Sequence, residues 1–278
     1  MPRAYYALVA GLPDLLLDNR RLPYSAEEFW NDSSDYLLPD DRALLGLLCL
    51  PVDNANVLAL LEERVDDFQG GGNFSQEVLE QEIKVPAILP EYLRLFIERY
   101  TGDGRKPEGT PWATVLAAMF YEAMQAHPNA FVRDWFTFDA NVRNVLVALN
   151  ARKLNVSADP QLAGHNTVSD AIRKNNSGDF GLGREFAYIE KIIALFDGKN
   201  LLEREQGLDM LRWETVEKMT VFEYFSIEKV MAFFVKLQIA ERWYSLDQEK
   251  GEQIFEKLIE ELRSGLDMSK EFSVSGGK

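Results

Sequence analysis

The sequence predicts an all-α protein made of many helices. Apolar residues recur at intervals of three and four through most of the 278 residues, which places them on one face of a helix. Asp, Ser or Pro stands just before several of these periodic stretches, as is typical of helix starts. No sustained alternation of apolar and polar residues predicts a strand, although residues 5–9 and 131–138 are candidates for short extended segments.

Four helices are predicted in the first third of the chain, at residues 40–50, 53–67, 74–82 and 90–100. Pro51 is expected to end the first of them, because proline has no amide hydrogen to donate inside a helix. Asp53 and Ser75 are expected to cap the second and the third, since their side-chain oxygens can accept from the first amides of a helix. The glycines at 70–72 separate these two helices.

Seven more helices are predicted in the rest of the chain, at residues 111–127, 139–154, 168–174, 184–197, 201–219, 226–244 and 248–262. The strongest apolar stripe belongs to 139–154, which Asp139 is expected to open as a capping residue. Ser226 is expected to cap the long helix that follows it. Apart from 168–174, the polar stretch 155–183 is expected to be loop.

A short sequence echo divides the chain into three helical units. Residues 53–57 (DNANV) resemble residues 139–142 (DANV), which begin 86 residues later, and Ser226 lies 87 residues further on. This spacing indicates a threefold pseudo-repeat. The alternative is chance, because Asp, Asn and Ser are common at helix starts. The expected units are residues 1–104, 105–183 and 184–263, followed by a flexible tail, 264–278.

Composition excludes several classes of function. The net charge of −15 repels phosphate backbones and anionic lipids, so nucleic acid is not expected as a partner. A single cysteine, Cys49, cannot form an internal disulfide, and with two histidines a structural zinc site is not expected. No uncharged apolar stretch reaches the roughly 20 residues of a membrane span, so the expected location is cytoplasmic, without direct insertion into the membrane.

Acidic residues are concentrated between 53 and 82, where eight acids accompany one base. Such a concentration favours encounter with a basic protein. The candidate partner-binding residues are Glu62, Glu63, Asp66 and Asp67. The alternative is an ordinary solvated helix face.

A second group of candidate partner-binding residues is basic or aromatic: Arg143, Arg152, Lys153, Arg212 and Trp213. Arginine and tryptophan are enriched where proteins meet. The alternative is that basic residues near helix ends only complement the helix dipole.

No pattern in the chain predicts catalysis or a bound cofactor. Residues 104–110 come nearest to a phosphate-binding loop, but no lysine stands between Gly109 and Thr110. The glycines of 178–183 do not have the spacing of a dinucleotide-binding loop. We therefore expect no enzyme activity, no cofactor and no metal.

Several blocks, in order along the chain, resemble a bacterial family of unknown function encoded in V-type ATP synthase operons. The blocks are residues 5–15 (YYALVAGLPDL), 53–56 (DNAN), 138–144 (FDANVRN), 150–153 (NARK), 203–205 (ERE), 208–213 (LDMLRW), 222–226 (FEYFS), 236–237 (KL) and 241–243 (ERW). That family looks like a shortened relative of the C/d subunit of the central stalk, which is named C in bacteria and d in eukaryotes. The C/d subunit is an all-helical, threefold pseudo-symmetric funnel between the rotating shaft and the proteolipid ring.

The resemblance implies a non-catalytic protein that couples the shaft to the ring. Its implied partners are the shaft subunits and the proteolipid ring, and its implied place is the cytoplasmic side of the inner membrane, reached through the ATP synthase. Two alternatives remain: an assembly or regulatory adaptor of that complex, and an unrecognised enzyme. At 278 residues the chain is short for a C/d subunit.

Overall fold

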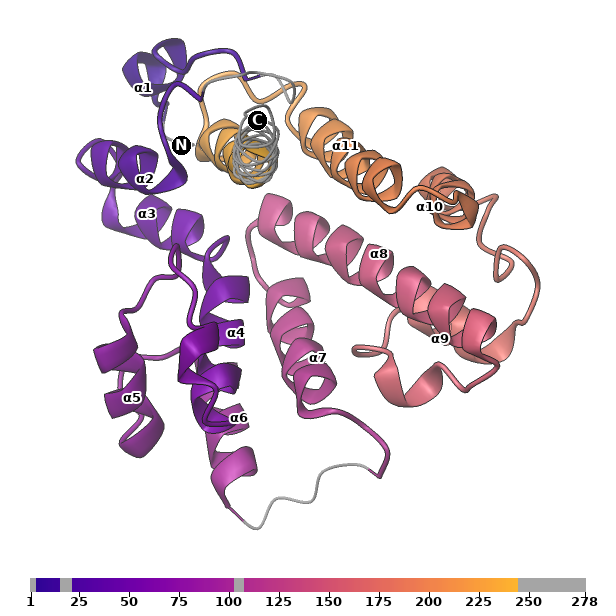
Figure 1. The fold of residues 1–278 in the computed structure, drawn as a ribbon. Helices are drawn as coiled ribbons and strands as arrows, with labels where there is room; N and C mark the ends of the chain where they lie inside the picture. The colour runs from indigo at the N-terminus through magenta and orange to yellow at the C-terminus, as the bar shows by residue number, and fades with distance from the viewer. Residues whose placement is uncertain (1–3, 16–21, 103–107, 245–278) are drawn as a thin grey trace, which may run out of the picture.

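The computed structural model describes residues 4–15, 22–102 and 108–244. Within these ranges every regular element is a helix, which confirms the predicted class (Figure 1). The elements are α1 (Tyr6–Ala10), α2 (Ala26–Ser34), α3 (Pro39–Gly46), α4 (Leu50–Leu61), the 3₁₀ turn η1 (Val65–Asp67), α5 (Gln76–Lys84), α6 (Glu91–Thr101), α7 (Trp112–Gln125), α8 (Ala130–Leu154), the 3₁₀ turn η2 (Asp159–Gln161), α9 (Thr167–Lys174), α10 (Ala187–Asp197), α11 (Leu201–Met219) and a last helix at 227–244.

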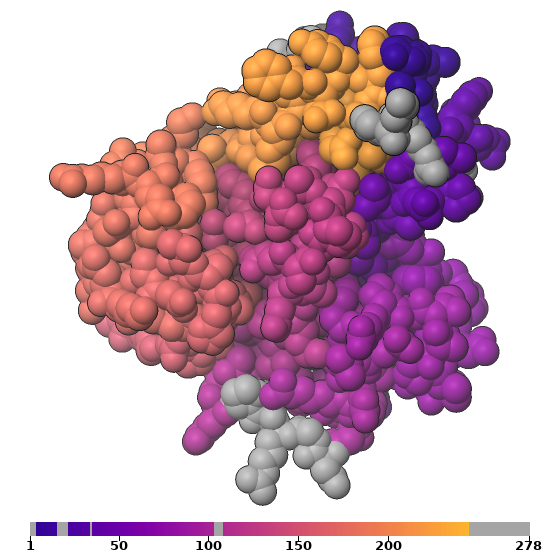
Figure 2. All heavy atoms as spheres, turned by 180° about the vertical axis from the view of Figure 1, so that it is seen from behind, coloured from indigo at the N-terminus to yellow at the C-terminus, as the bar shows by residue number. Residues whose placement is uncertain are grey.

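Helix α8 is the centre of the molecule. It contacts α7, α9, α10 and α11, and its residues Val132, Val142 and Val145 are fully buried. A helix with apolar residues on most of its faces is stable only when neighbours cover it on several sides. Helices α4–α6 lie on one side of the α7–α8 pair and α9–α10 on the other, as Figures 1 and 2 show.

The two ends of the described chain pack together. The amide of Tyr5 donates to the carbonyl of Phe225, at 2.6 Å, and α1 therefore lies beside the segment before the last helix. In α2, the ring of Phe29 lies 5.2 Å from that of Phe233 and 5.7 Å from that of Phe234. The N-terminal helices thus complete the packing of the last helix (Figure 1).

Several predicted helix boundaries are wrong. Pro51 occupies the first turn of α4 instead of ending a helix, because a first-turn amide needs no acceptor within the helix. Asp53 and Asp139 lie inside α4 and α8, so neither opens a helix. Residues 131–138 are helical, since Asn129 caps a 25-residue helix that includes them. Residues 6–10 form α1 and are not extended.

Other predicted features are confirmed or lie outside the described residues. Helix α11 has the predicted bounds, 201–219, and Ser75 caps α5 by accepting from the amide of Val78. Ser226 precedes the last helix, but its hydroxyl is buried without a hydrogen-bond partner among the described residues. The predicted helix 248–262 and the tail 264–278 lie outside the described residues.

Among the described residues no single helix is long and apolar enough to cross a membrane. Helices α3 and α4 meet the length and composition of a span only as a pair, and that pair is bent by 57°.

Helix α4 ends in a left-handed residue. Glu63 has a φ of 57°, and the amide of Arg64 donates to the carbonyl of Ala59 at 2.8 Å, which closes a Schellman motif. Side chains disfavour this conformation, whereas glycine adopts it readily.

Replacing Glu63 by Gly is therefore expected to raise the free energy of unfolding by about 0.5–1 kcal/mol. Urea denaturation followed by circular dichroism measures it. Glu62→Gly is the matched control, because Glu62 has a φ of −93° and gains nothing from glycine. Equal or lower stability of Glu63→Gly than of the wild type would contradict the strain argument.

Candidate functional site

Two asparagines hold the loops on either side of the α7–α8 pair in the same way. Asn56 of α4 donates from Nδ2 to the carbonyl of Gln69, at 2.9 Å, and its Oδ1 accepts from the amide of Gln69, at 2.8 Å. Asn144 of α8 makes the same two bonds with Ala163, at 3.0 and 2.9 Å. Both asparagines are fully buried. We call these contacts the Asn56 clamp and the Asn144 clamp.

One turn before each clamp, a second polar side chain holds the same loop. Asp53 accepts from the amide of Asn73, at 2.8 Å, and from its side-chain amide, at 2.6 Å. Asn141, three residues before Asn144, accepts from the side chain of Asn166 at 2.9 Å. In each case the chain continues from the loop into a short helix, α5 or α9.

A tyrosine from the following helix completes each arrangement. Tyr92, the second residue of α6, donates to Oδ1 of Asn54 at 2.8 Å. Tyr188, the second residue of α10, accepts from Nδ2 of Asn141 at 2.9 Å. The order helix, clamped loop, short helix, tyrosine helix therefore occurs twice, in α4–α6 and in α8–α10.

The sequence echo predicted a repetition here, but it aligned the two segments two residues out of register. Asp53 corresponds by its contacts to Asn141, 88 residues later, and not to Asp139. The sequence signal is Asp or Asn, two variable residues, then Asn and a buried Val, as in 53–57 and 141–145. Interpreting both runs as helix starts conceals this signal, because the matching residues lie inside their helices.

Asp53 is fully buried, and this affects its ionisation. Burial raises the pKa of Asp53 to about 6, against the lowering effect of the hydrogen bonds from Asn73 and Phe74. A β-carbon on Gly72 would collide with the Asp53 carboxylate, so the glycine allows the loop to approach it. An unfolded Asp has a pKa of about 3.9.

The folded state therefore binds the Asp53 proton more tightly than the unfolded state does. The stability that this group contributes is present below about pH 4 and is lost as the pH rises through about 6. Relative to Asp53→Asn, the wild type should gain about 1 kcal/mol of unfolding free energy between pH 7.5 and 5. Urea titrations at several pH values measure this difference, with Asp66→Asn as the control for an exposed carboxylate. Parallel pH profiles of the wild type and Asp53→Asn would refute it.

The predicted acidic residues lie at the end of α4 and in η1. Arg64 forms ion pairs with Glu62, at 2.7 Å, and with Asp67, so part of the local charge is neutralised inside the cluster. Glu63 and Asp66 are exposed. A role of these four acids in partner binding stays a prediction.

Arg212, one of the predicted basic residues, lies beside Asp139. Tyr121 donates to Asp139 at 2.7 Å, and Nε of Arg212 lies 3.5 Å from the same carboxylate. Arg212 also pairs with the buried Asp209 at 3.0 Å. Burial lowers the pKa of the Arg212 guanidinium, but Asp139 and Asp209 outweigh it and raise the pKa overall. Residues Tyr121, Asp139, Asp209 and Arg212 form the Asp139 cluster.

The Asp139 cluster joins four helices. Tyr121 comes from α7, Asp139 from α8 and Arg212 from α11. In the last helix, Trp243 donates to Asp209 at 2.9 Å, and Arg242 lies 3.4 Å from it. Ion pairs at such a junction fix the relative position of the helices, because each charge needs its partner.

Arg143 and Trp213 are engaged inside the fold. Arg143 donates to the carbonyl of Gln161, at 3.1 Å, and burial lowers its pKa. Trp213 is buried, and its indole donates to Glu217, while Lys236 lies 4.6 Å above its ring. These contacts support the fold, and a role in partner binding stays a prediction for both residues.

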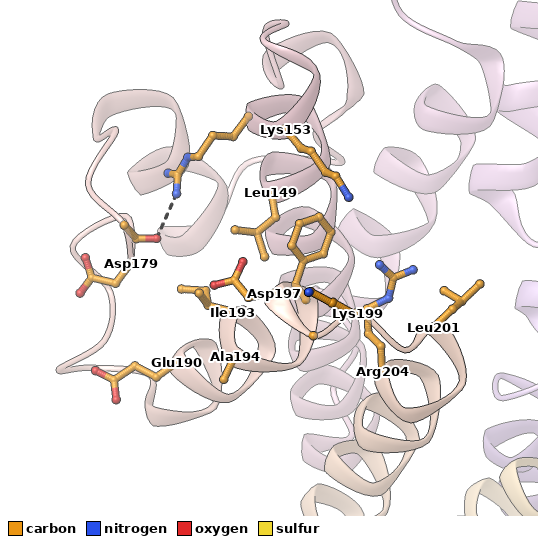
Figure 3. A pocket seen from close by; sticks show the side chains of 14 residues that line it. Leu149, Lys153, Asp179, Glu190, Ile193, Ala194, Asp197, Lys199, Leu201 and Arg204 are labelled. Atoms are coloured by element: carbon orange, nitrogen blue, oxygen red, sulfur yellow. Dashed lines mark hydrogen bonds between the residues drawn. The ribbon is translucent and has the colours of Figure 1, made fainter.

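Arg152 and Lys153 line a surface groove of about 1040 Å³ at the end of α8 (Figure 3). Arg152 donates to the carbonyls of Ser177 and Gly178, and its guanidinium lies 4.5 Å above the ring of Phe180. Lys153 is exposed and has no ion-pair partner among the described residues.

The remaining chemistry-bearing side chains form no ligand set. In the described part of the chain, no group of three His, Cys, Asp or Glu residues could hold a metal ion. Burial, followed by the nearby Asp53, raises the pKa of the Cys49 thiol to about 12. Nδ1 of His127 accepts from the amide of Asn129, and His165 lies 3.2 Å from Asp170.

Comparison with known proteins links the chain to one family. Residues 2–266 match a family described as "Protein of unknown function (DUF2764)". No curated protein and no solved structure matches the chain. Since the match covers nearly the whole sequence, the chain belongs to the DUF2764 family.

Proposed function

We propose that the protein is a non-catalytic component of a V-type ATP synthase, where it couples the rotating central shaft to the membrane proteolipid ring. The sequence resemblance supplies the complex and the partners. The observation that best supports the proposal is the internal repetition of the Asn56 and Asn144 clamps.

A protein descended from a threefold pseudo-symmetric ancestor, such as the C/d subunit, is expected to keep repeated structural units. Helices α4–α6 and α8–α10 each carry an asparagine clamp and a short helix, and in each a tyrosine at the second position of the following helix contacts a polar side chain of the long helix. The last described helix, 227–244, packs against α2, and the segment before it contacts α1. The two repeated units support a pseudo-symmetric body, and the third expected unit, 184–263, stays a prediction.

A coupler must transmit torque without deforming. The two clamps fix loops to helices by paired hydrogen bonds, and the Asp139 cluster ties α7, α8, α11 and the last helix together. Buried, fully satisfied polar contacts make local sliding costly. The two clamps and the Asp139 cluster would make the protein as rigid as a coupling subunit needs to be.

One exposed aromatic surface is a candidate contact for a partner. It consists of Tyr6, Val221, Phe222, Tyr224 and Phe225, and Phe222 is 82% exposed. The rings of Tyr6 and Phe225 lie 4.6 Å apart, so the surface is continuous between α1 and the segment before the last helix. Aromatic side chains grouped on a surface often mark a protein interface. We call it the aromatic corner.

Affinity purification of the native ATP synthase through its shaft subunits tests the proposal. We expect this protein to co-purify with the D and F subunits of the shaft and with the proteolipid ring, in a fixed ratio to the shaft. Phe222→Ser with Tyr224→Ser, in the aromatic corner, should reduce its recovery, whereas Val85→Ser, at another exposed apolar side chain, should not. Presence well below one copy per shaft would favour the transient adaptor. Absence from the purified complex would overturn both roles.

A further inference from the structure

The groove at the end of α8 has three cations gathered on one side. Lys153, Lys199 and Arg204 come from α8, from the turn before α11 and from the first turns of α11. Figure 3 shows their charged ends on one side of the groove, the carboxylates of Asp179 and Glu190 on the other, and Asp197 between them. The protein as a whole carries −15, so this cationic side stands out against its surroundings.

These cations have few partners inside the protein. Lys153 and Lys199 are exposed and form no ion pair within the described ranges. Nε of Arg204 is buried without a hydrogen bond there, and it lies 3.6 Å from Glu205. The guanidinium lies 5.5 Å from the ring centroid of Phe196, which holds it against the groove wall. The charges are therefore positioned, and two of them are available to a partner.

Apolar side chains accompany the cations. Leu149, Ile193 and Phe196 line the groove, and Leu201 is 62% exposed at its edge. Exposed aliphatic groups beside basic ones fit a partner that offers both acidic and apolar side chains. A phosphate ion would satisfy the cations but would leave these aliphatic groups in water.

We propose that this groove binds an acidic amphipathic segment of a partner protein. Carboxylates of the segment face Lys153, Lys199 and Arg204, and its apolar side chains cover Leu201 and the groove floor. The site does not depend on the proposed role in the ATP synthase, because it is argued from the groove alone.

Fluorescence anisotropy with the full-length protein tests this. The probe is a labelled synthetic amphipathic helix with Leu at intervals of three and four and Glu at most other positions. The variant Lys153→Glu with Lys199→Glu should weaken its binding about tenfold or more. The matched control, Lys84→Glu with Lys174→Glu, makes the same change of net charge at exposed lysines elsewhere and should leave binding within about twofold. Arg204 is kept because it packs against Phe196.

Two further measurements separate the apolar contribution to binding from the contribution of charge. Leu201→Ser, at the exposed edge of the groove, should weaken binding of the same probe severalfold, and a probe with Gln in place of Glu should bind the wild type weakly. No binding of the Glu probe, or equal weakening by both lysine variants, would overturn the proposal. Displacement of the probe by low-millimolar inorganic phosphate, with no effect of Leu201→Ser, would identify an anion site instead. None of these measurements involves the ATP synthase, so this site and the proposed function can fail separately.

Discussion

Replacing Asn144 by Ala is expected to lower the free energy of unfolding by about 3 kcal/mol. The change removes the two hydrogen bonds to Ala163 and a weaker one from Arg143, and it leaves the buried amide and carbonyl of Ala163 without partners. Each lost bond costs about 1 kcal/mol, and each unsatisfied buried group adds a desolvation cost. Asn56→Ala should have a smaller effect through Gln69, because the contacts have the same geometry but Gln69 is exposed and water can reach its backbone groups.

Urea denaturation measures the loss, and amide hydrogen exchange locates it. In Asn144→Ala the amide of Ala163 should lose protection while that of Gln69 keeps it, and Asn56→Ala should give the reverse. Asn150→Ala is the matched control, since Asn150 is exposed on the same helix. A loss in Asn144→Ala no larger than in Asn150→Ala would mean that the clamp does not stabilise the fold.

Replacing Arg212 by Met is expected to cost about 3–5 kcal/mol, more than any other single substitution in this protein that we propose. It leaves the partly buried Asp139 without its ion-pair partner, and it removes one of the two cations beside Asp209, which is 2% exposed and keeps only Arg242. A buried charge that loses its partner is strongly destabilising. The loss should appear in urea denaturation and as loosening between α8, α11 and the last helix.

Neutralising the carboxylates should restore part of this stability. Arg212→Met combined with Asp139→Asn and Asp209→Asn no longer buries an uncompensated charge, so we expect it to be more stable than Arg212→Met alone. Arg152→Met is the control, because Arg152 contacts backbone carbonyls and an aromatic ring, and should cost about 1 kcal/mol. Failure of the triple variant to recover stability would show that Arg212 acts by packing and not by charge.

The fold was largely predictable because its signals are local. The spacing of Leu208, Leu211 and Val216 in α11 and the capping Ser75 of α5 depend on neighbours within a few residues. Predicted helix boundaries were wrong where one residue type is compatible with two positions in a helix. Pro51 can end a helix or open one, and Asp53 can cap a helix or lie buried inside it. Sequence spacing alone does not separate these uses.

The candidate sites were predictable only as residue types. Arg143, Arg152, Lys153 and Arg212 share a basic character in the sequence, yet two of them lie in polar contacts inside the fold and two line a surface groove. Lys199 and Arg204, which complete the cationic side of that groove, belong to a segment distant from Lys153 in the sequence. Their juxtaposition comes from the packing of α10 and α11 beside α8.

The sequence by itself determined the all-helical class, most of the helices and the presence of an internal echo, because periodicity and capping act over a single turn or a few turns. Only the tertiary structure decided what the echo is. It is a pair of buried asparagine clamps, at Asn56 and Asn144, whose partners lie 13 and 19 residues further along the chain. The physical reason is that a buried polar side chain takes its role from the backbone groups that folding brings to it, and those groups are not its neighbours in the sequence.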